Sequence, residues 1–412
     1  YGLYTDRQFE SFTPDQDQDN ATRVENDSPF WGVKLDGYIT DDHHVEFTYF
    51  DTTNETRTRN LAFDRATGEE GAEAGGVNGR GGGQNYVARY TGVLAPWLTV
   101  SAAYGVNKLR DGSLPLDISN ERVIDYREND GGIDIGLNKV TDAYGYTDDE
   151  REFFRGDVDL NFELAGTHHV RFGYDHETDT SEQIHQTMGE GFYTIWKAGE
   201  SDAAQLGIAE GTEYYRTRVY SNNGVSTVKN DAFYIQDDWA LINDRLKLQL
   251  GVRNDRFSNQ GVSGESYYES GDQWAPRLGA SYDLRGDGRT KVYGFYGEYF
   301  LPLAGDINLN VMGGRVTYTR YNLLNGLDPA KNTPLGGAPI LGASGFSACP
   351  DTGIVNCGVQ ADGSAADPSG AVAQNLQPQT SPEVILGMEH RFSNRIRAGA
   401  HFPHRKLDHG VG

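Results

Sequence analysis

Residues 229–257, KNDAFYIQDDWALINDRLKLQLGVRNDRF, and residues 273–300, QWAPRLGASYDLRGDGRTKVYGFYGEYF, contain four strand-like segments in succession. Turns are predicted at Ile242–Asp244 and at Gly286-Asp287-Gly288. In the second segment the apolar positions alternate with polar ones, and the apolar positions are Leu246, Leu248, Leu250 and Val252. The polar positions between and beside them are Arg245, Lys247, Gln249 and Arg253. This period-two pattern predicts a strand whose two faces meet different environments.

The third segment repeats the pattern, with apolar side chains at Trp274, Leu278, Ala280, Tyr282 and Leu284. The positions between them include Arg277, Ser281 and Asp283. No helical crossover separates the four segments, so the strands are expected to be antiparallel. Two architectures fit: a sandwich buries the apolar face against a second sheet, and an outer-membrane barrel turns that face toward lipid.

Loop length decides between these architectures. Further hairpins are predicted within residues 30–49, 86–106, 152–176 and 382–401, each with a turn of two to three residues. Between hairpins lie long polar segments at residues 11–28, 51–84, 108–150, 177–228 and 301–380. These are far longer than the usual connection of about four to six residues. Short turns at one end and long loops at the other are typical of a transmembrane antiparallel outer-membrane β-barrel, with short periplasmic turns and long extracellular loops.

The composition agrees with this all-β fold class. The chain is 37% hydrophobic, and its mean hydropathy of −0.62 excludes a helical membrane protein. A barrel remains allowed because only alternate strand residues face lipid. The net charge of −24 provides no basic stripe for phosphates, which argues against nucleic acid as a partner.

The two cysteines of the chain, Cys349 and Cys357, lie in one polar loop. Such a close pair predicts a local disulfide in an oxidising compartment. A zinc site is the alternative, but no second pair of ligands lies nearby in the sequence.

The acidic loop near the N-terminus carries Asp15, Asp17 and Asp19 at alternate positions. This spacing resembles the start of a calcium-binding loop, although the glycine and the distal glutamate of an EF-hand are missing. Calcium in acidic loops is therefore one interpretation, and a solvated acidic loop is the other. No other cofactor is expected.

Neither catalysis nor a histidine metal site is indicated by the sequence. No G-x-S-x-G motif occurs, and no carboxylate pair stands out as an acid/base couple. Histidine pairs occur at His43-His44 and His168-His169. Adjacent residues of a strand point to opposite faces, so neither pair is suited to chelate one metal ion.

The segments DAFYIQDDW (231–239), RLKLQLGVRNDRF (245–257) and APRLGASYDLRGDGRTKVYGFYGEYF (275–300) resemble the TonB-dependent receptor family, especially its Oar-like branch. FWGVKLDGYITDDHHVEFTYF (30–50) is similar to an early barrel hairpin of that branch. The resemblance implies a barrel of about 22 strands around a plug, and import powered through the TonB complex. Residues 1–412 are then interpreted as a partial β-barrel domain of about 12 to 13 strands, with the plug domain and the C-terminal strands outside this chain.

The expected function is that of a bacterial outer-membrane receptor for a bulky nutrient: a peptide, an oligosaccharide or a metal chelate. A passive porin-like channel or a structural surface barrel is the alternative, and a secreted carbohydrate-binding β protein is a third interpretation. Expected partners are outer-membrane lipids and lipopolysaccharide, the TonB complex by resemblance, and a surface lipoprotein or an extracellular ligand.

Ligand contacts are expected from the long loops, where aromatic side chains beside arginine can stack on a sugar or a peptide. Packing within folded-down loops is the alternative role for each such residue. The candidates are Tyr193, Trp196, Tyr214, Tyr215, Arg216, Arg315, Tyr318 and Tyr321.

Overall fold

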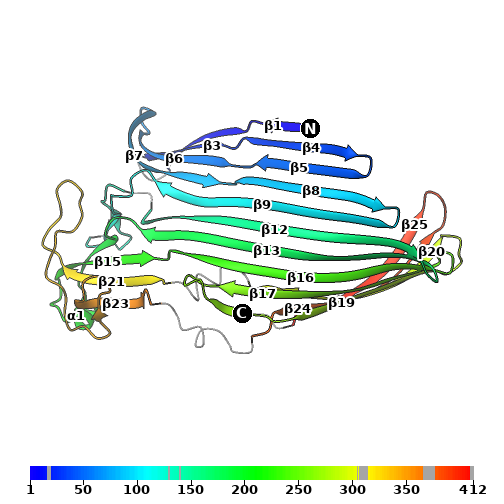
Figure 1. Cartoon of the computed structure of the whole chain (residues 1–412). Coiled ribbons are helices and arrows are strands. Elements are labelled where there is room, and N and C mark those ends of the chain that lie inside the picture. Colours follow the sequence, from blue (N-terminus) through cyan, green and yellow to red (C-terminus); the bar gives the residue numbers. More distant parts are fainter. Residues whose placement is uncertain are drawn as a thin grey trace.

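The computed structural model describes residues 1–15, 20–128, 130–138, 141–303, 305, 314–364 and 376–408. Its strands belong to one 25-stranded sheet, and one short helix lies among them. The long strands lie side by side and form a curved wall, with tight turns at one end and the longer connections, including the helix, at the other (Figure 1).

The wall is a continuous antiparallel ladder of neighbouring strands. In spatial order its strands are β1 (Gly2–Thr5), β4 (Phe30–Thr40), β5 (His43–Asp51), β8 (Gln84–Ala95), β9 (Leu98–Pro115), β12 (Ala143–Glu163), β13 (Thr167–Thr187), β16 (Gly224–Leu241), β17 (Leu246–Gln260), β19 (Gln273–Asp283), β20 (Thr290–Leu301), β24 (Gln379–Arg391) and β25 (Arg397–Arg405). This meander confirms the predicted barrel-type fold.

The tight turns lie where the sequence predicts them. Ile242, Asn243 and Asp244 all have positive φ between β16 and β17. Ala165 and Gly166, also with positive φ, join β12 to β13. Positive φ at consecutive positions is how a tight turn matches the twist of the strands that it connects.

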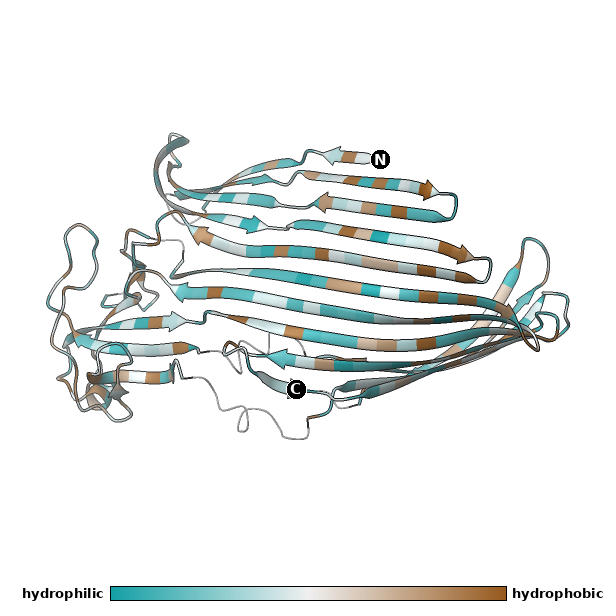
Figure 2. Cartoon of the chain, viewed as in Figure 1, coloured by the Kyte–Doolittle hydropathy of each residue, from teal (hydrophilic) through white to brown (hydrophobic). Residues whose placement is uncertain are grey.

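The two faces of the wall differ in chemistry, as the alternation predicts. Val158, Phe172, Ile235 and Val252 are successive cross-strand partners on one face. Phe172 and Ile235 are 40% and 50% exposed, although both are large and apolar. A sandwich would bury such a face against a second sheet, so its exposure identifies the lipid-facing side of a barrel wall. Figure 2 shows apolar positions recurring between polar ones along these strands.

Aromatic side chains mark the extracellular limit of the lipid-facing side. They follow one another across the strands as Tyr49, Tyr86, Tyr104, Phe154, Tyr174, Phe233 and Trp274. At the other limit, the His168 ring stacks between Phe162 and Trp239, with both pairs of ring centroids 4.9 Å apart. Aromatic rings in two such rows are typical of the membrane interfaces of outer-membrane barrels.

Several segments predicted to be polar loops are strands instead. Residues 11–28 contain most of β2 (Gln8–Pro14) and β3 (Asn20–Asp27), and residues 51–84 contain β6 (Asn54–Asp64) and β7 (Glu69–Gly81). The strands β9 and β12 likewise extend far into the predicted loop 108–150, and β13 extends into 177–228. The loop prediction was wrong here because a strand that projects beyond the membrane has water on both faces. It therefore has no need of alternating apolar residues.

The histidine pairs confirm the expectation of opposite faces. His43 Nδ1 lies 2.7 Å from the Tyr90 hydroxyl on the lipid-facing side, whereas His44 Nε2 lies 3.5 Å from Asp36 Oδ1 on the other side. His168 Nδ1 lies 2.7 Å from Asp237 Oδ2, and His169 Nε2 lies 2.9 Å from Asp159 Oδ1 on the opposite side.

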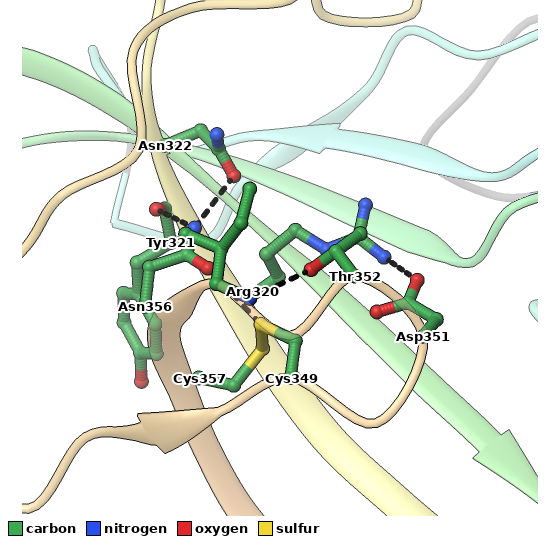
Figure 3. The surroundings of a disulfide bond; sticks show 9 residues. Arg320, Tyr321, Asn322, Cys349, Asp351, Thr352, Asn356 and Cys357 are labelled. Atoms are coloured by element: carbon green, nitrogen blue, oxygen red, sulfur yellow. Dashed lines mark hydrogen bonds and ion pairs between the residues drawn. A yellow bond between two sulfur atoms is a disulfide. The ribbon is translucent and has the colours of Figure 1, made fainter.

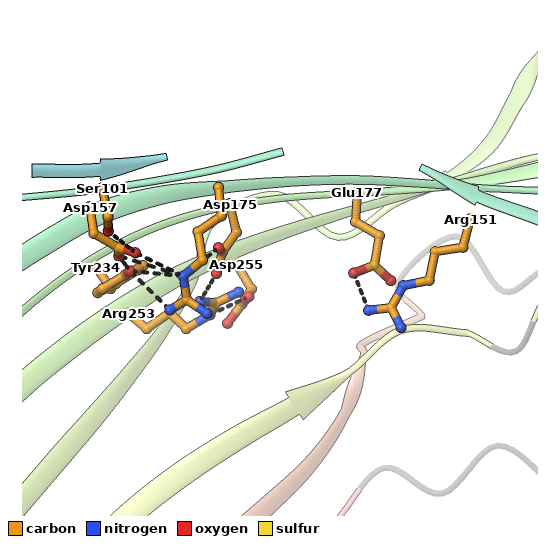
Figure 4. Close-up of polar contacts among 9 residues, drawn as sticks. Ser101, Arg151, Asp157, Asp175, Glu177, Tyr234, Arg253 and Asp255 are labelled. Carbon is orange, nitrogen blue, oxygen red and sulfur yellow. Dashed lines mark hydrogen bonds and ion pairs between the residues drawn. The ribbon is translucent and has the colours of Figure 1, made fainter. Parts of the chain in front are cut away.

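A polar network covers the lumenal face of the wall (Figure 4). Arg155 Nη2 donates to the Tyr234 hydroxyl at 2.9 Å, and Arg155 Nε lies 3.3 Å from Asp175 Oδ1. Arg253 pairs with Asp175 at 2.6 Å and with Asp255 at 2.8 Å. Lumenal charges therefore neutralise one another across β12, β13, β16 and β17.

Within the described ranges, no helix is long and apolar enough to cross a membrane.

Substituting Leu278, which lies on the lipid-facing side beside Leu250 and Tyr296, tests the assignment of the two faces. Leu278→Lys should destabilise the folded barrel in lipid vesicles by about 2–4 kcal/mol, because it places a charge in hydrocarbon. Gln249→Lys, on the lumenal side beside Asp238, is the matched control and should cost less than about 1 kcal/mol. Urea titration of vesicle-inserted protein measures both, and equal losses would contradict the assignment.

Gly173 tests the lumenal network, because a Cβ atom there would lie 2.6 Å from the Tyr234 hydroxyl and 2.6 Å from the Gly156 carbonyl oxygen. Gly173→Ala should therefore displace Tyr234 and cost about 1–3 kcal/mol of stability. At Gly156 a Cβ would meet the Phe154 ring at 3.8 Å, an ordinary contact. Gly156→Ala should leave the urea midpoint unchanged, and similar midpoint shifts in both variants would count against the steric argument.

Candidate functional site

Three long connections interlock at the extracellular end of the wall. Their strands form one ordered run, in which each strand pairs with the next. The run is β11 (Ile133–Asp134), β10 (Val123–Asp125), β14 (Phe192–Lys197), β15 (Glu213–Ser221), β21 (Val316–Leu323), β23 (Val355–Asp362) and β22 (Ser347–Ala348). We call this unit, together with the helix α1 (Glu200–Leu206), the extracellular lobe.

Ion pairs and hydrogen bonds join the three connections. Arg127, in the first connection, lies 2.7 Å from Asp125 and 2.7 Å from Glu213, which belongs to the second. Asn332, in the third connection, donates from Nδ2 to the Ile135 carbonyl at 2.8 Å. The Arg127 guanidinium lowers the pKa of Asp125, so this contact is ionic at neutral pH.

Four of the candidate tyrosines lie inside the lobe. Tyr193 and Tyr215 share a hydrophobic cluster with Val123 and Ile195, and Tyr214 and Tyr318 are 0% and 3% exposed. Burial raises the pKa of Tyr214, although the nearby Arg216 opposes this effect. These tyrosines hold the lobe together, which is the packing role that the sequence analysis named as the alternative.

Arg216 lies at the centre of an aromatic cluster. Its guanidinium carbon is 4.6 Å from the centroid of the Trp196 ring and 5.7 Å from that of Tyr321. Its Nη2 donates to the Tyr214 hydroxyl at 2.8 Å, and that hydroxyl donates to Asp202 of α1 at 3.1 Å. The arrangement stabilises the cation on ring faces and thereby fixes α1 against the lobe sheet.

The sequence analysis grouped Arg315 with these residues, but it lies apart from them. It is an exposed residue just before β21, and its carbonyl accepts from the Gly363 N–H at 3.1 Å. Conversely, the sequence analysis missed Tyr126, whose ring stacks on Trp196 with centroids 4.2 Å apart. A signal was present, because Tyr126 directly precedes Arg127 and so shows the same pattern of an aromatic residue beside arginine as the other candidates.

The predicted disulfide between Cys349 and Cys357 is present, and both cysteines are buried (Figure 3). They pack against Tyr318, so the bond attaches β22 to the lobe core. Asn356, beside it, donates from Nδ2 to the Tyr321 carbonyl at 2.9 Å.

Of the proposed calcium ligands, Asp17 and Asp19 lie outside the described residues. The Asp15 N–H donates to the Asn20 carbonyl at 2.9 Å. In the part of the chain that the structure describes, no group of three or more His, Cys, Asp or Glu side chains is placed to hold a metal ion.

A cavity of about 710 Å³, which we call the vestibule, lies on the lumenal face just below the lobe. Its lining includes Asp149, Arg151, Asp179, His185 and Asn222. Arg151 lies 2.5 Å from Glu177, on the same side of the sheet as the lumenal network (Figure 4). The sequence analysis missed this site, because its residues lie where β12 and β13 extend beyond the membrane.

The disulfide allows a test of the lobe. Replacing both cysteines, Cys349→Ser with Cys357→Ser, should destabilise the lobe by about 2–3 kcal/mol through the lost loop constraint. Amide hydrogen exchange should quicken at residues 347–362 and stay unchanged in β12 and β13. Reductant should reproduce this effect in the unmodified protein and have none in the double variant. Unchanged exchange at residues 347–362 would contradict a structural role for the bond.

The comparisons with known proteins agree with this geometry. Residues 1–381 match the family model described as TonB dependent receptor-like, beta-barrel. The chain is 25% identical over 269 residues to the TonB-dependent transporter Oar of Myxococcus xanthus, covering 59% of this chain and 24% of Oar.

One solved structure supports the same fold, and a second gives a slightly lower score. The RagAB peptide transporter superposes with a TM-score of 0.52 at 10% identity, over 98% of this chain and 44% of that chain. The outer membrane transporter YddB from Escherichia coli gives a TM-score of 0.49 at 11% identity, over 98% and 46%. This chain spans less than half the length of each of these relatives. The family match over residues 1–381 nevertheless covers most of the chain, which therefore belongs to the TonB-dependent receptors, a family of bacterial outer-membrane β-barrel transporters rather than enzymes.

Proposed function

We propose that this protein imports a bulky nutrient across the outer membrane with energy delivered by the TonB complex. The observation that carries the proposal is the interlocked extracellular lobe above a polar lumenal wall. A surface built from three connections, with a cavity of about 710 Å³ beneath it, is suited to capture a ligand before passage. Family membership supports the energised step.

The cargo classes that fit are a peptide, an oligosaccharide and a metal chelate. All three are too large for simple diffusion through a narrow pore, and all can be held by the polar and aromatic side chains that the lobe and the vestibule contain. No catalytic step is part of the proposal.

Two partners follow from the same proposal. The TonB complex is the energy source implied by the family. Lipopolysaccharide is proposed to contact the lipid-facing side above the aromatic row, where charged side chains replace apolar ones. There Lys108 lies 2.8 Å from Glu150, and Arg110 pairs with Asp148. Headgroups of the outer leaflet lie at this level and offer both phosphates and bound cations.

The test compares the native host with a strain that lacks this gene. Both receive labelled peptide mixtures, oligosaccharides and ferric chelates, with and without a protonophore that dissipates the inner-membrane proton gradient. One of these classes should accumulate only in energised cells that carry the gene. Its uptake should saturate at a concentration that reflects the affinity of the receptor.

A passive channel gives a different result. Uptake would then rise linearly with concentration and persist after the protonophore is added. That outcome would contradict energised import and favour the porin-like alternative.

A further inference from the structure

The vestibule has an excess of hydrogen-bond acceptors. The carboxylate of Asp149 lines it and forms no ion pair or hydrogen bond with any described residue, although the backbone of Asp149 pairs within the sheet. Asp179 lies 3.9 Å from Arg151 Nε, but Arg151 makes its closer contact, at 2.5 Å, with Glu177. Two carboxylates of the cavity therefore lack a close cationic partner.

Asn222 provides an independent observation. It lines the vestibule and is 3% exposed, and its Oδ1 is buried with no hydrogen-bond partner among the described residues. A buried acceptor without a donor costs about 1–3 kcal/mol, so native proteins seldom leave one unsatisfied. A ligand that donates a hydrogen bond here would remove this penalty.

The electrostatic environment of Asp179 points to the same ligand chemistry. Burial raises the pKa of this carboxyl to about 6, and the neighbouring Glu177 and Asp149 add to the effect, whereas Arg151 opposes it. A carboxylate held among other carboxylates gains most from a cation that enters between them. A metal ion is disfavoured, because the described residues contain no group of three suitable ligands.

We propose that the vestibule binds the positively charged end of the imported nutrient, the free ammonium group of a short basic peptide. Asp149 and Asp179 accept from the ammonium group, and Asn222 Oδ1 accepts from a donor beside it. A volume of about 710 Å³ is within the range of about 300–1,000 Å³ that is usual for small-ligand sites. This inference rests on the proposed import function and names its substrate class.

Binding is measured on the complete protein in detergent, with trilysine carrying a C-terminal fluorophore as the probe. Trilysine should bind, and trilysine with acetylated amines should bind at least about tenfold more weakly, which is the size of one charge-assisted hydrogen bond. Asp179→Asn and Asp149→Asn should each weaken trilysine binding by about tenfold. Asp130→Asn, which removes an exposed carboxylate outside the vestibule, is the matched control and should change nothing.

The pH dependence separates Asp179 from its neighbours. Above a pH of about 6 its carboxylate is charged and binds the cation, and below that pH the carboxyl is protonated and the interaction is lost. Affinity should therefore fall between pH 7 and pH 5, and Asp179→Asn should flatten this fall. The other titratable side chains on this face of the cavity are Asp149 and Arg151 on β12, Glu177 and His185 on β13, and Tyr220 on β15, so a slope that persists in the variant would belong to them.

Equal affinity for trilysine and its acetylated form, or unchanged affinity in both aspartate variants, would overturn the assignment of the vestibule. The mobility shift on heating in detergent gels verifies that each variant is folded. Energised uptake that is the same in the Asp149→Asn and Asp179→Asn variants as in the unmodified protein would leave the proposed import function intact. Conversely, charge-dependent binding without energised uptake would contradict import and retain the binding site.

Discussion

Backbone hydrogen bonding is the constraint on which the rest of the structure depends. In hydrocarbon no water can satisfy a peptide group, so each membrane-spanning strand has to pair with neighbours along its length. The antiparallel meander from β1 to β25 provides this pairing, with short turns at one end of the wall and long connections at the other. Once this backbone pairing is fixed, side chains can vary, provided that the lipid-facing side stays apolar and the lumenal side stays polar. The same wall can therefore carry Phe172 toward lipid and Arg171 toward the lumen at adjacent positions.

The strands were predictable from the sequence wherever one face contacts lipid and the other contacts water. Inside the membrane, alternation at Leu246–Val252 and at Trp274–Leu284 locates strands and turns correctly, because lipid and water impose opposite demands. Beyond the membrane that contrast disappears. The sequences of β3 and β6 are mostly polar and lack a regular apolar alternation, so the pattern does not distinguish them from solvated loops.

The candidate site was predictable only in part, for a different physical reason. The aromatic residues of the long connections were predicted as ligand contacts, but Tyr193, Tyr214, Tyr215 and Tyr318 are buried in the lobe. Whether a tyrosine faces a ligand or a core depends on strand pairing between connections that lie about a hundred residues apart, such as β15 with β21. The vestibule was missed because Asp149 and Asp179 become neighbours only where β12 and β13 remain paired beyond the membrane, and the sequence analysis predicted loops there.

The construction of the lobe has a consequence for how such receptors can diversify. The three connections follow one another across its sheet, so that β14 of the second pairs with the first connection and β15 of the second pairs with the third. Replacing any one connection with that of a relative would therefore leave at least one of the others with an unmatched strand edge. New specificity is therefore expected to arise by exchange of the three connections as a set, or by point substitutions on a conserved framework, rather than by grafting single loops.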